Sequence, residues 1–174
     1  MKKTLMTLAA VLCCASLFTS CQKGNNASSE ENKPDNTPAF VELGISMPAT
    51  QDMLSYANTV LFYNDGTGEK KETLSSTSWA KTLKVALPCN ISFGRTITVK
   101  DGVELTKDKQ FSYSSGCYVT YNILNSAGAK VKAGGTSGST STASLTADKV
   151  ATLIEKGSLN ETHSYSFDKD GNVK

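Results

Sequence analysis

A single histidine limits the nucleophilic chemistry open to this chain of 174 residues. Any Ser-His or Cys-His arrangement must use His163, because the nucleophile needs a neighbouring base. His163 alternates with serines beside Tyr165 and Phe167, a pattern typical of a half-buried strand. No Gly-x-Ser-x-Gly nucleophile elbow accompanies it. We therefore expect a protein that is not an enzyme, with a hydrolase using His163 as the last alternative.

Residues for metal or nucleotide chemistry are equally sparse. One histidine and the distant pair Cys89 and Cys117 cannot supply the clustered ligands of a zinc site. Residues 168–172 begin like a calcium loop, but their glycine stands too early for an EF-hand, so they predict a reverse turn. The glycine-rich segment 133–142 contains no lysine to face a phosphate. We expect neither metal nor cofactor.

Aromatic side chains leave glycan binding open. Exposed rings stack on sugar faces, and the only tryptophan, Trp79, follows a run of serine and threonine that is typical of a loop edge. Tyr113 and Tyr118 are the tyrosines we select to complete such a surface. The alternative is that Trp79 packs into the core ahead of the next strand, as lone aromatic residues of small domains usually do.

The first 21 residues have the pattern of an export signal. Lys2 and Lys3 precede an apolar run at 5–18, which is shorter than the roughly 20 residues that a membrane-spanning helix needs. Ser20 then supplies a small residue directly before Cys21. This stretch resembles the lipobox of bacterial lipoproteins, of the kind found in Bacteroidetes. The resemblance covers residues 1–21 only and implies cleavage after residue 20 and lipidation of Cys21.

The charge of the processed chain argues against nucleic acid as a partner. Removing residues 1–20 takes away two lysines and no acid, so Lys+Arg falls from 18 to 16 against an Asp+Glu count of 16. Binding to phosphates needs a basic excess, and so does binding to a membrane surface without lipid. We therefore expect the lipid on Cys21 to hold the protein in the cell envelope. Gln22 is not the Asp that resembles an inner-membrane retention signal, which favours the outer membrane on either face.

Two cysteines, Cys89 and Cys117, remain after processing. Outside the cytoplasm they are candidate disulfide partners, and a loop of that length would contribute about 3 kcal/mol of stability. The alternative is two separately buried thiols, because spacing along the sequence does not establish proximity.

The rest of the chain divides into a tether and one domain. Residues 21–38 carry the anchor and a polar segment too poor in apolar side chains to fold, so they predict a disordered tether. From residue 39 to 174, apolar residues mostly alternate with polar ones, which indicates strands. Such runs occur at 40–45, 60–63, 83–87, 91–99, 117–123 and 163–167.

Turn and helix signals punctuate these strands. Asn64, Asp65 and Gly66 predict a hairpin turn, and Asp101-Gly102 predicts a second hairpin, joining 91–99 to 103–105. Apolar residues at helical spacing predict one short helix over 147–154, capped by Thr146. The glycine- and serine-rich run at 134–142 before it predicts a flexible loop.

These observations predict a mainly β protein, an antiparallel β-sandwich of immunoglobulin-like or related type, with one short helix near the C-terminus. A small barrel is the alternative fold. The expected function is a membrane-anchored envelope lipoprotein with a non-enzymatic binding domain, whose partner is a glycan or an envelope protein. The alternative function is a structural or adhesin-type, fimbrial-like assembly component.

Overall fold

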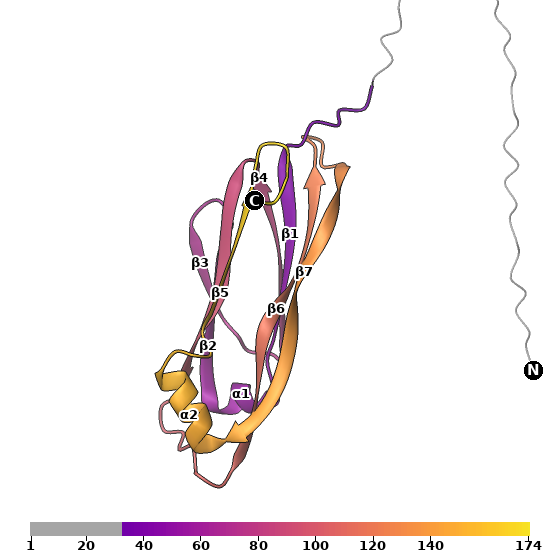
Figure 1. The fold of residues 1–174 in the computed structure, drawn as a ribbon. Coiled ribbons are helices and arrows are strands. Elements are labelled where there is room, and N and C mark those ends of the chain that lie inside the picture. The colour runs from indigo at the N-terminus through magenta and orange to yellow at the C-terminus, as the bar shows by residue number, and fades with distance from the viewer. Residues whose placement is uncertain (1–32) are drawn as a thin grey trace, which may run out of the picture. The chain divides into compact units, whose positions relative to one another are not determined.

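Eight strands and two short helices form the part of the chain that a computed structural model describes, residues 33–174 (Figure 1). The expected signal peptide, Cys21 and most of the expected tether lie outside these residues. The helices are α1 (Gln51–Tyr56) and α2 (Ala147–Glu155). The strands are β1 (Phe40–Pro48), β2 (Ala57–Asn64), β3 (Glu69–Thr73), β4 (Ser78–Ala86), β5 (Cys89–Val99), β6 (Gln110–Leu124), β7 (Lys130–Thr146) and β8 (Glu161–Phe167).

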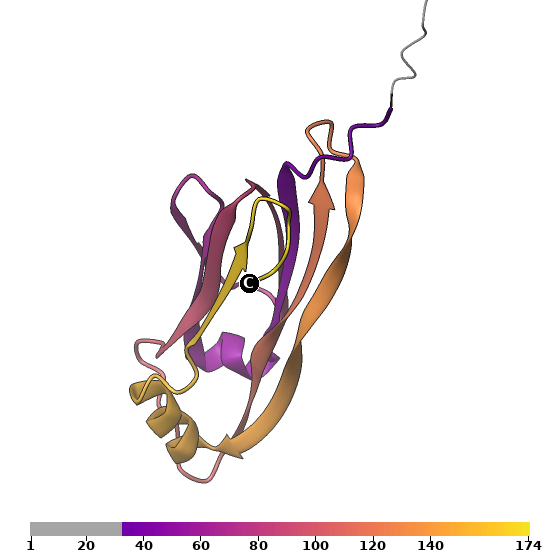
Figure 2. The same ribbon diagram turned by 45° about the horizontal axis from the view of Figure 1, so that its top comes forward.

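The strands pair into two antiparallel sheets. The first has the order β4-β1-β6-β7 and the second the order β3-β2-β5-β8. The two sheets lie face to face in both views, with α2 at one end (Figures 1 and 2). The predicted antiparallel sandwich is therefore confirmed, and the two sheets do not join into a barrel. The chain passes repeatedly between the sheets, so each sheet contains strands from both halves of the domain.

Period-two alternation explains how the two sheets bury a common core. In β1, Val41, Leu43, Ile45 and Met47 are all at most 2 % exposed, while the residues between them are partly exposed. Strand β5 repeats this pattern in the facing sheet, where Phe93 is fully buried. Successive side chains of a strand point to opposite faces, so an alternating sequence builds one dry face and one wet face.

The predicted helix is confirmed as α2. Thr146 precedes it in extended conformation, and Val150 and Ile154 are buried against the sandwich. The helix ends at Glu155, and Gly157 just past it has a φ of 65° that permits the amide of Ser158 to reach the carbonyl of Leu153. The sequence did not reveal α1, which has only six residues. Such a short helix shows too little periodicity to be recognised.

Two predictions about connections were wrong. Asp101 and Gly102 do form a turn, with Gly102 at a φ of 73°, but residues 103–105 form no strand and no hairpin follows. The chain instead crosses there from β5 in one sheet to β6 in the other. The predicted flexible loop at 134–142 is part of β7, paired with β6 along its length. By contrast, the turn at residues 64–66 does join the hairpin of β2 and β3.

The N-terminal segment enters at the end of the sandwich where β6 turns into β7. The amide of Ala39 donates to the carbonyl of Leu124 at 2.8 Å. The side-chain amide of Asn125 donates to the carbonyl of Asp35 at 2.6 Å. These contacts hold the incoming chain at the opposite end of the domain from α2 (Figure 1).

Candidate functional site

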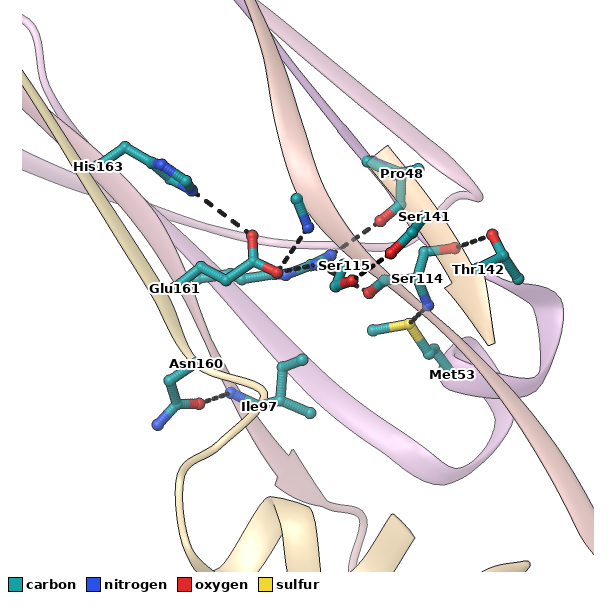
Figure 3. A network of polar contacts seen from close by, with 12 residues as sticks. Pro48, Met53, Ile97, Ser114, Ser115, Ser141, Thr142, Asn160, Glu161 and His163 are labelled. Atoms are coloured by element: carbon teal, nitrogen blue, oxygen red, sulfur yellow. Dashed lines mark hydrogen bonds and ion pairs between the residues drawn. The ribbon is translucent and has the colours of Figure 1, made fainter. Parts of the chain in front are cut away.

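The most unusual polar group of the core is Arg95, in the middle of β5. Its side chain is fully buried. One terminal nitrogen, Nη1, donates to the carbonyl of Pro48 at 2.9 Å. The other, Nη2, donates to the carbonyl of Ser114 at 2.7 Å and to Glu161 Oε1 at 2.6 Å (Figure 3). Arg95 therefore connects its own sheet to β1 and β6 of the facing sheet.

Glu161 completes this connection from β8. Its Oε1 also accepts from the amide of Gly116 at 2.7 Å. Its Oε2 lies 3.6 Å from His163 Nε2 (Figure 3). The imidazole stacks on Phe93, with ring centroids 5.4 Å apart. Oε2, His163 Nε2 and Arg95 Nε are buried and make no hydrogen bond within residues 33–174. Only one oxygen of the Glu161 carboxylate, Oε1, therefore accepts hydrogen bonds, from Arg95 and from the amide of Gly116.

The chemistry available to this cluster is structural pairing. Arg95, Glu161 and His163 supply a cation, a carboxylate and an imidazole. Arg95 and Glu161 are already hydrogen-bonded to other groups of the protein. A hydroxyl nucleophile would need to lie within about 3.2 Å of the imidazole to use it as a base. The contacts of His163 are instead Glu161 and the ring of Phe93. A buried ion pair has lost its contacts with water, and here backbone hydrogen bonds to Arg95 and Glu161 replace part of them.

A second polar cluster closes the opposite side of the sandwich. Glu72 of β3 accepts from Tyr63 Oη at 2.6 Å, Trp79 Nε1 at 2.8 Å and Lys81 Nζ at 2.6 Å. These hydrogen bonds, with that from Lys81 the strongest contribution, lower the pKa of Glu72 to about 2. The same contact raises the pKa of Lys81 above its usual value. Because Glu72 belongs to one sheet and Lys81 to the other, the ion pair joins the two edge strands.

The three aromatic residues selected from the sequence do not share a surface. Trp79 lies opposite Met47, whose side chain is buried, so its ring is directed toward the interior and packs on Tyr63 at 5.9 Å. Tyr118 is 47 % exposed and lies on the outer face of the same sheet. Tyr113 is half-buried near the far end of β6. The structure brings none of these three rings together.

The two cysteines are also apart, and both thiols are free. Cys89 pairs with Phe167, whose ring packs against Tyr121. Tyr121 is four residues along β6 from Cys117, which corresponds to about 13 Å of strand. The candidate disulfide is therefore not formed in this structure. Burial raises the pKa of both thiols.

Cavities in the described domain do not gather the selected residues either. A hollow of about 520 Å³ opens beside the β2–β3 turn and is lined by Asn64, Lys84, Cys89 and their neighbours. Trp79, the two selected tyrosines and His163 are not among the residues that line it. Its walls combine the β2–β3 turn with polar and apolar residues where β4 ends and β5 begins, and it is widely open to solvent.

Strand β7 contains the longest uninterrupted run of exposed residues among the described strands. It is 17 residues long, lies at the edge of its sheet, and pairs only with β6 among the described residues. Residues 136–144 are exposed without interruption, so both faces of the strand are open there as well as its outer edge. Figure 2 shows β7, in orange, as a long border running down to α2. A free strand edge presents unpaired amide and carbonyl groups.

Charge distinguishes β7 from the other three edge strands. Glu72 of β3, Lys81 of β4 and Glu161 of β8 all point inward, since each lies opposite a buried residue of the neighbouring strand. Inward-pointing charges on short edge strands are a means of preventing further strands from adding. Residues 133–146 of β7 are fourteen in number and include no charged side chain and no proline.

Sequence analysis missed this edge because its composition is typical of a loop. Gly, Ser and Thr have low apolar content, and the 134–142 segment therefore lacks the alternation that indicates a strand. Pairing with β6 overrides that composition, with Gly138 at a φ of 91° facing Tyr118. The one available signal was the four threonines of β7, since β-branched residues favour strands.

Comparison with protein-family models, with curated proteins and with solved structures gave no match. Within residues 33–174, no three His, Cys, Asp or Glu side chains are grouped to hold a metal ion. In that same part of the chain, neither helix has the length and apolar character to cross a membrane.

Proposed function

We propose that this protein is a lipid-anchored component of the cell envelope that binds protein partners by adding their strands to the free edge of β7. The lipobox-like residues ending at Cys21 support the anchor. The uncharged and unpaired edge of residues 133–146 supports the mode of binding. In strand addition, main-chain hydrogen bonds supply affinity, and an exposed sheet edge is the only preformed requirement.

The observation that carries this proposal is the contrast between β7 and the other edges. A domain that protects three edges with inward charges and leaves its longest edge bare would risk aggregation without a use for it. The assembly role is therefore favoured over glycan capture, because Trp79, Tyr113 and Tyr118 form no common surface. Catalysis by His163 is not favoured either, because no hydroxyl group of residues 33–174 makes a hydrogen bond with its Nε2.

A photo-crosslinking residue placed in living cells tests the binding mode. We expect the side chain introduced at Ser139 of β7 to capture a protein, because a partner strand would lie within a few ångströms. The control position is Lys71 of β3, another exposed edge residue, which should capture far less. Equal capture at both positions, or none at Ser139, would overturn strand addition at β7.

The anchor has its own test. Cys21→Ala should move the protein from the membrane fraction to the soluble fraction, because Cys21 is the residue that would carry the lipid. Cys89→Ala, which also removes one thiol, should leave the fractionation unchanged. A Cys21→Ala protein that still fractionates with membranes would contradict lipid attachment at this residue.

A further inference from the structure

We infer that the strand added to β7 is the β7 strand of a second copy of this chain, running antiparallel to the first. This inference rests on the proposed function, because it names the partner that the free edge takes. Its result is one continuous sheet of eight strands, with the order β4-β1-β6-β7 followed by its own symmetry mate. A two-fold interface of this kind is self-complementary, since the same surface serves on both sides.

Absence of charge makes the β7 edge complementary to itself. Two copies of residues 133–146 can approach without placing any like charges opposite each other. The shared stretch is about 45 Å long at the usual rise per residue. Residues 136–144 are exposed and β7 pairs only with β6 among the described residues, so its outer edge is open to a second strand. Opposed threonine and serine pairs favour such sheets through cross-strand hydrogen bonds.

The two lysines of β7 decide the direction of pairing. Lys130 and Lys132 lie together at the N-terminal end of the strand. In a parallel pair, each lysine would face its own copy, and like charges directly opposite destabilise a sheet. In an antiparallel pair centred on residues 133–146, the lysines of each copy lie past the C-terminal end of the other copy's uncharged stretch. The lysines of the two copies are then at opposite ends of the interface. Antiparallel pairing is also slightly more stable per residue than parallel pairing, since its hydrogen bonds run perpendicular to the strands.

The centre of the uncharged stretch places the two-fold axis at Ser139 or Thr140. The residue on the axis then lies opposite the same residue of the second copy. Every other residue lies opposite one that is equally far from the axis on its other side. The N-terminal segments of the two copies leave from opposite ends of the joined sheet, because each enters beside Leu124. Because Asp35 is held at the domain, 13 residues separate it from Cys21, and they reach up to about 43 Å when extended, so both anchors can meet one membrane.

Cysteine substitution in the full chain, in cells, tests both the partner and the direction. In a chain that also carries Cys117→Ser, because Cys117 lies directly opposite Ser139 on β6, we expect either Ser139→Cys or Thr140→Cys to yield a disulfide-linked dimer under mild oxidation. Thr136→Cys alone should yield none, but co-expressed with the chain carrying Thr142→Cys or Ser144→Cys it should yield a mixed dimer. The Cys117→Ser parent chain, and the same chain with Lys71→Cys on β3, provide the background.

Each result supports or overturns the inference. Dimer formation by Thr136→Cys alone, as strong as at the centre, would show parallel pairing and overturn it. No dimer above background at any β7 position would overturn it as well. If the photo-crosslinker at Ser139 then captures a different protein, the proposed function stands and only the identity of the partner is wrong. A further variant, Ser141→Lys, should reduce dimer yield several-fold, while Thr152→Lys on α2 should not.

Discussion

The guanidinium of Arg95 and the carboxylate of Glu161 meet at 2.6 Å inside the sandwich, with the arginine fully buried. They lie opposite each other on β5 and β8, and each also bonds to the backbone of the facing sheet. The pair therefore sets the spacing of the two sheets at the side where β7 projects. Two charges out of water are tolerated here because each has its partner and backbone contacts.

Breaking this pair should be costly. Glu161→Gln leaves the buried cation of Arg95 without a counter-charge, and we expect a loss of about 3–5 kcal/mol in the free energy of unfolding. The double variant Arg95→Met/Glu161→Gln should recover part of that loss, because no charge remains buried. Urea denaturation followed by Trp79 fluorescence measures both. A Glu161→Gln protein as stable as the exposed-site control Glu69→Gln would show that the pair is not required.

Acid should loosen the opposite side of the sandwich through Glu72. Its pKa of about 2 in the folded protein is below the usual value, so its contribution to stability is present above the unfolded-state pKa. That contribution is lost as the pH falls from about 5 toward 2, when the carboxylate is protonated. We expect the difference in Tm between wild type and Glu72→Gln to shrink over this range. A difference that is constant with pH would contradict the lowered pKa.

Gly116 should be intolerant of a side chain. It has a φ of 83°, and a Cβ there would lie 2.1 Å from the carbonyl oxygen of Ser139 in β7. Gly102 has a similar φ of 73°, but a Cβ there would meet nothing within 4 Å. Gly102→Ala should therefore lose about 1–2 kcal/mol from backbone strain alone, and Gly116→Ala clearly more. Hydrogen exchange should show β7 detaching from β6 only in Gly116→Ala, and equal protection in both variants would refute this reason.

The predictions that the structure confirms came from alternating apolar residues and from turn residues. The alternation around Leu43 and that around Phe93 predicted inward faces, and both side chains are fully buried. Gly157 marked the end of α2 because only its positive φ allows the closing hydrogen bonds. These signals are local: a strand's period or a glycine's φ depends on a few neighbouring residues. They predicted the class of fold and the one longer helix.

Site residues could not be predicted in the same way. Arg95 reads in the sequence as an ordinary polar position of a strand, and its partners lie 47, 19 and 66 residues away. Trp79 read as a candidate ring for ligands, but its indole donates to Glu72, seven residues earlier and on a different sheet. Such partners are chosen by strand order, which depends on the packing of the whole domain.

By itself, therefore, the sequence determined the antiparallel sandwich, its alternating core, the β2–β3 turn and the helix α2, all from local periodicity and turn residues. Only the tertiary structure decided that residues 134–142 are a strand, because pairing with β6 outweighs a loop-like composition. The tertiary structure also decided that Glu72, Lys81 and Glu161 protect three edges and that β7 is left bare. Which strand lies at an edge is a property of the assembled sheets, where hydrogen bonds between distant segments compete for the same partners.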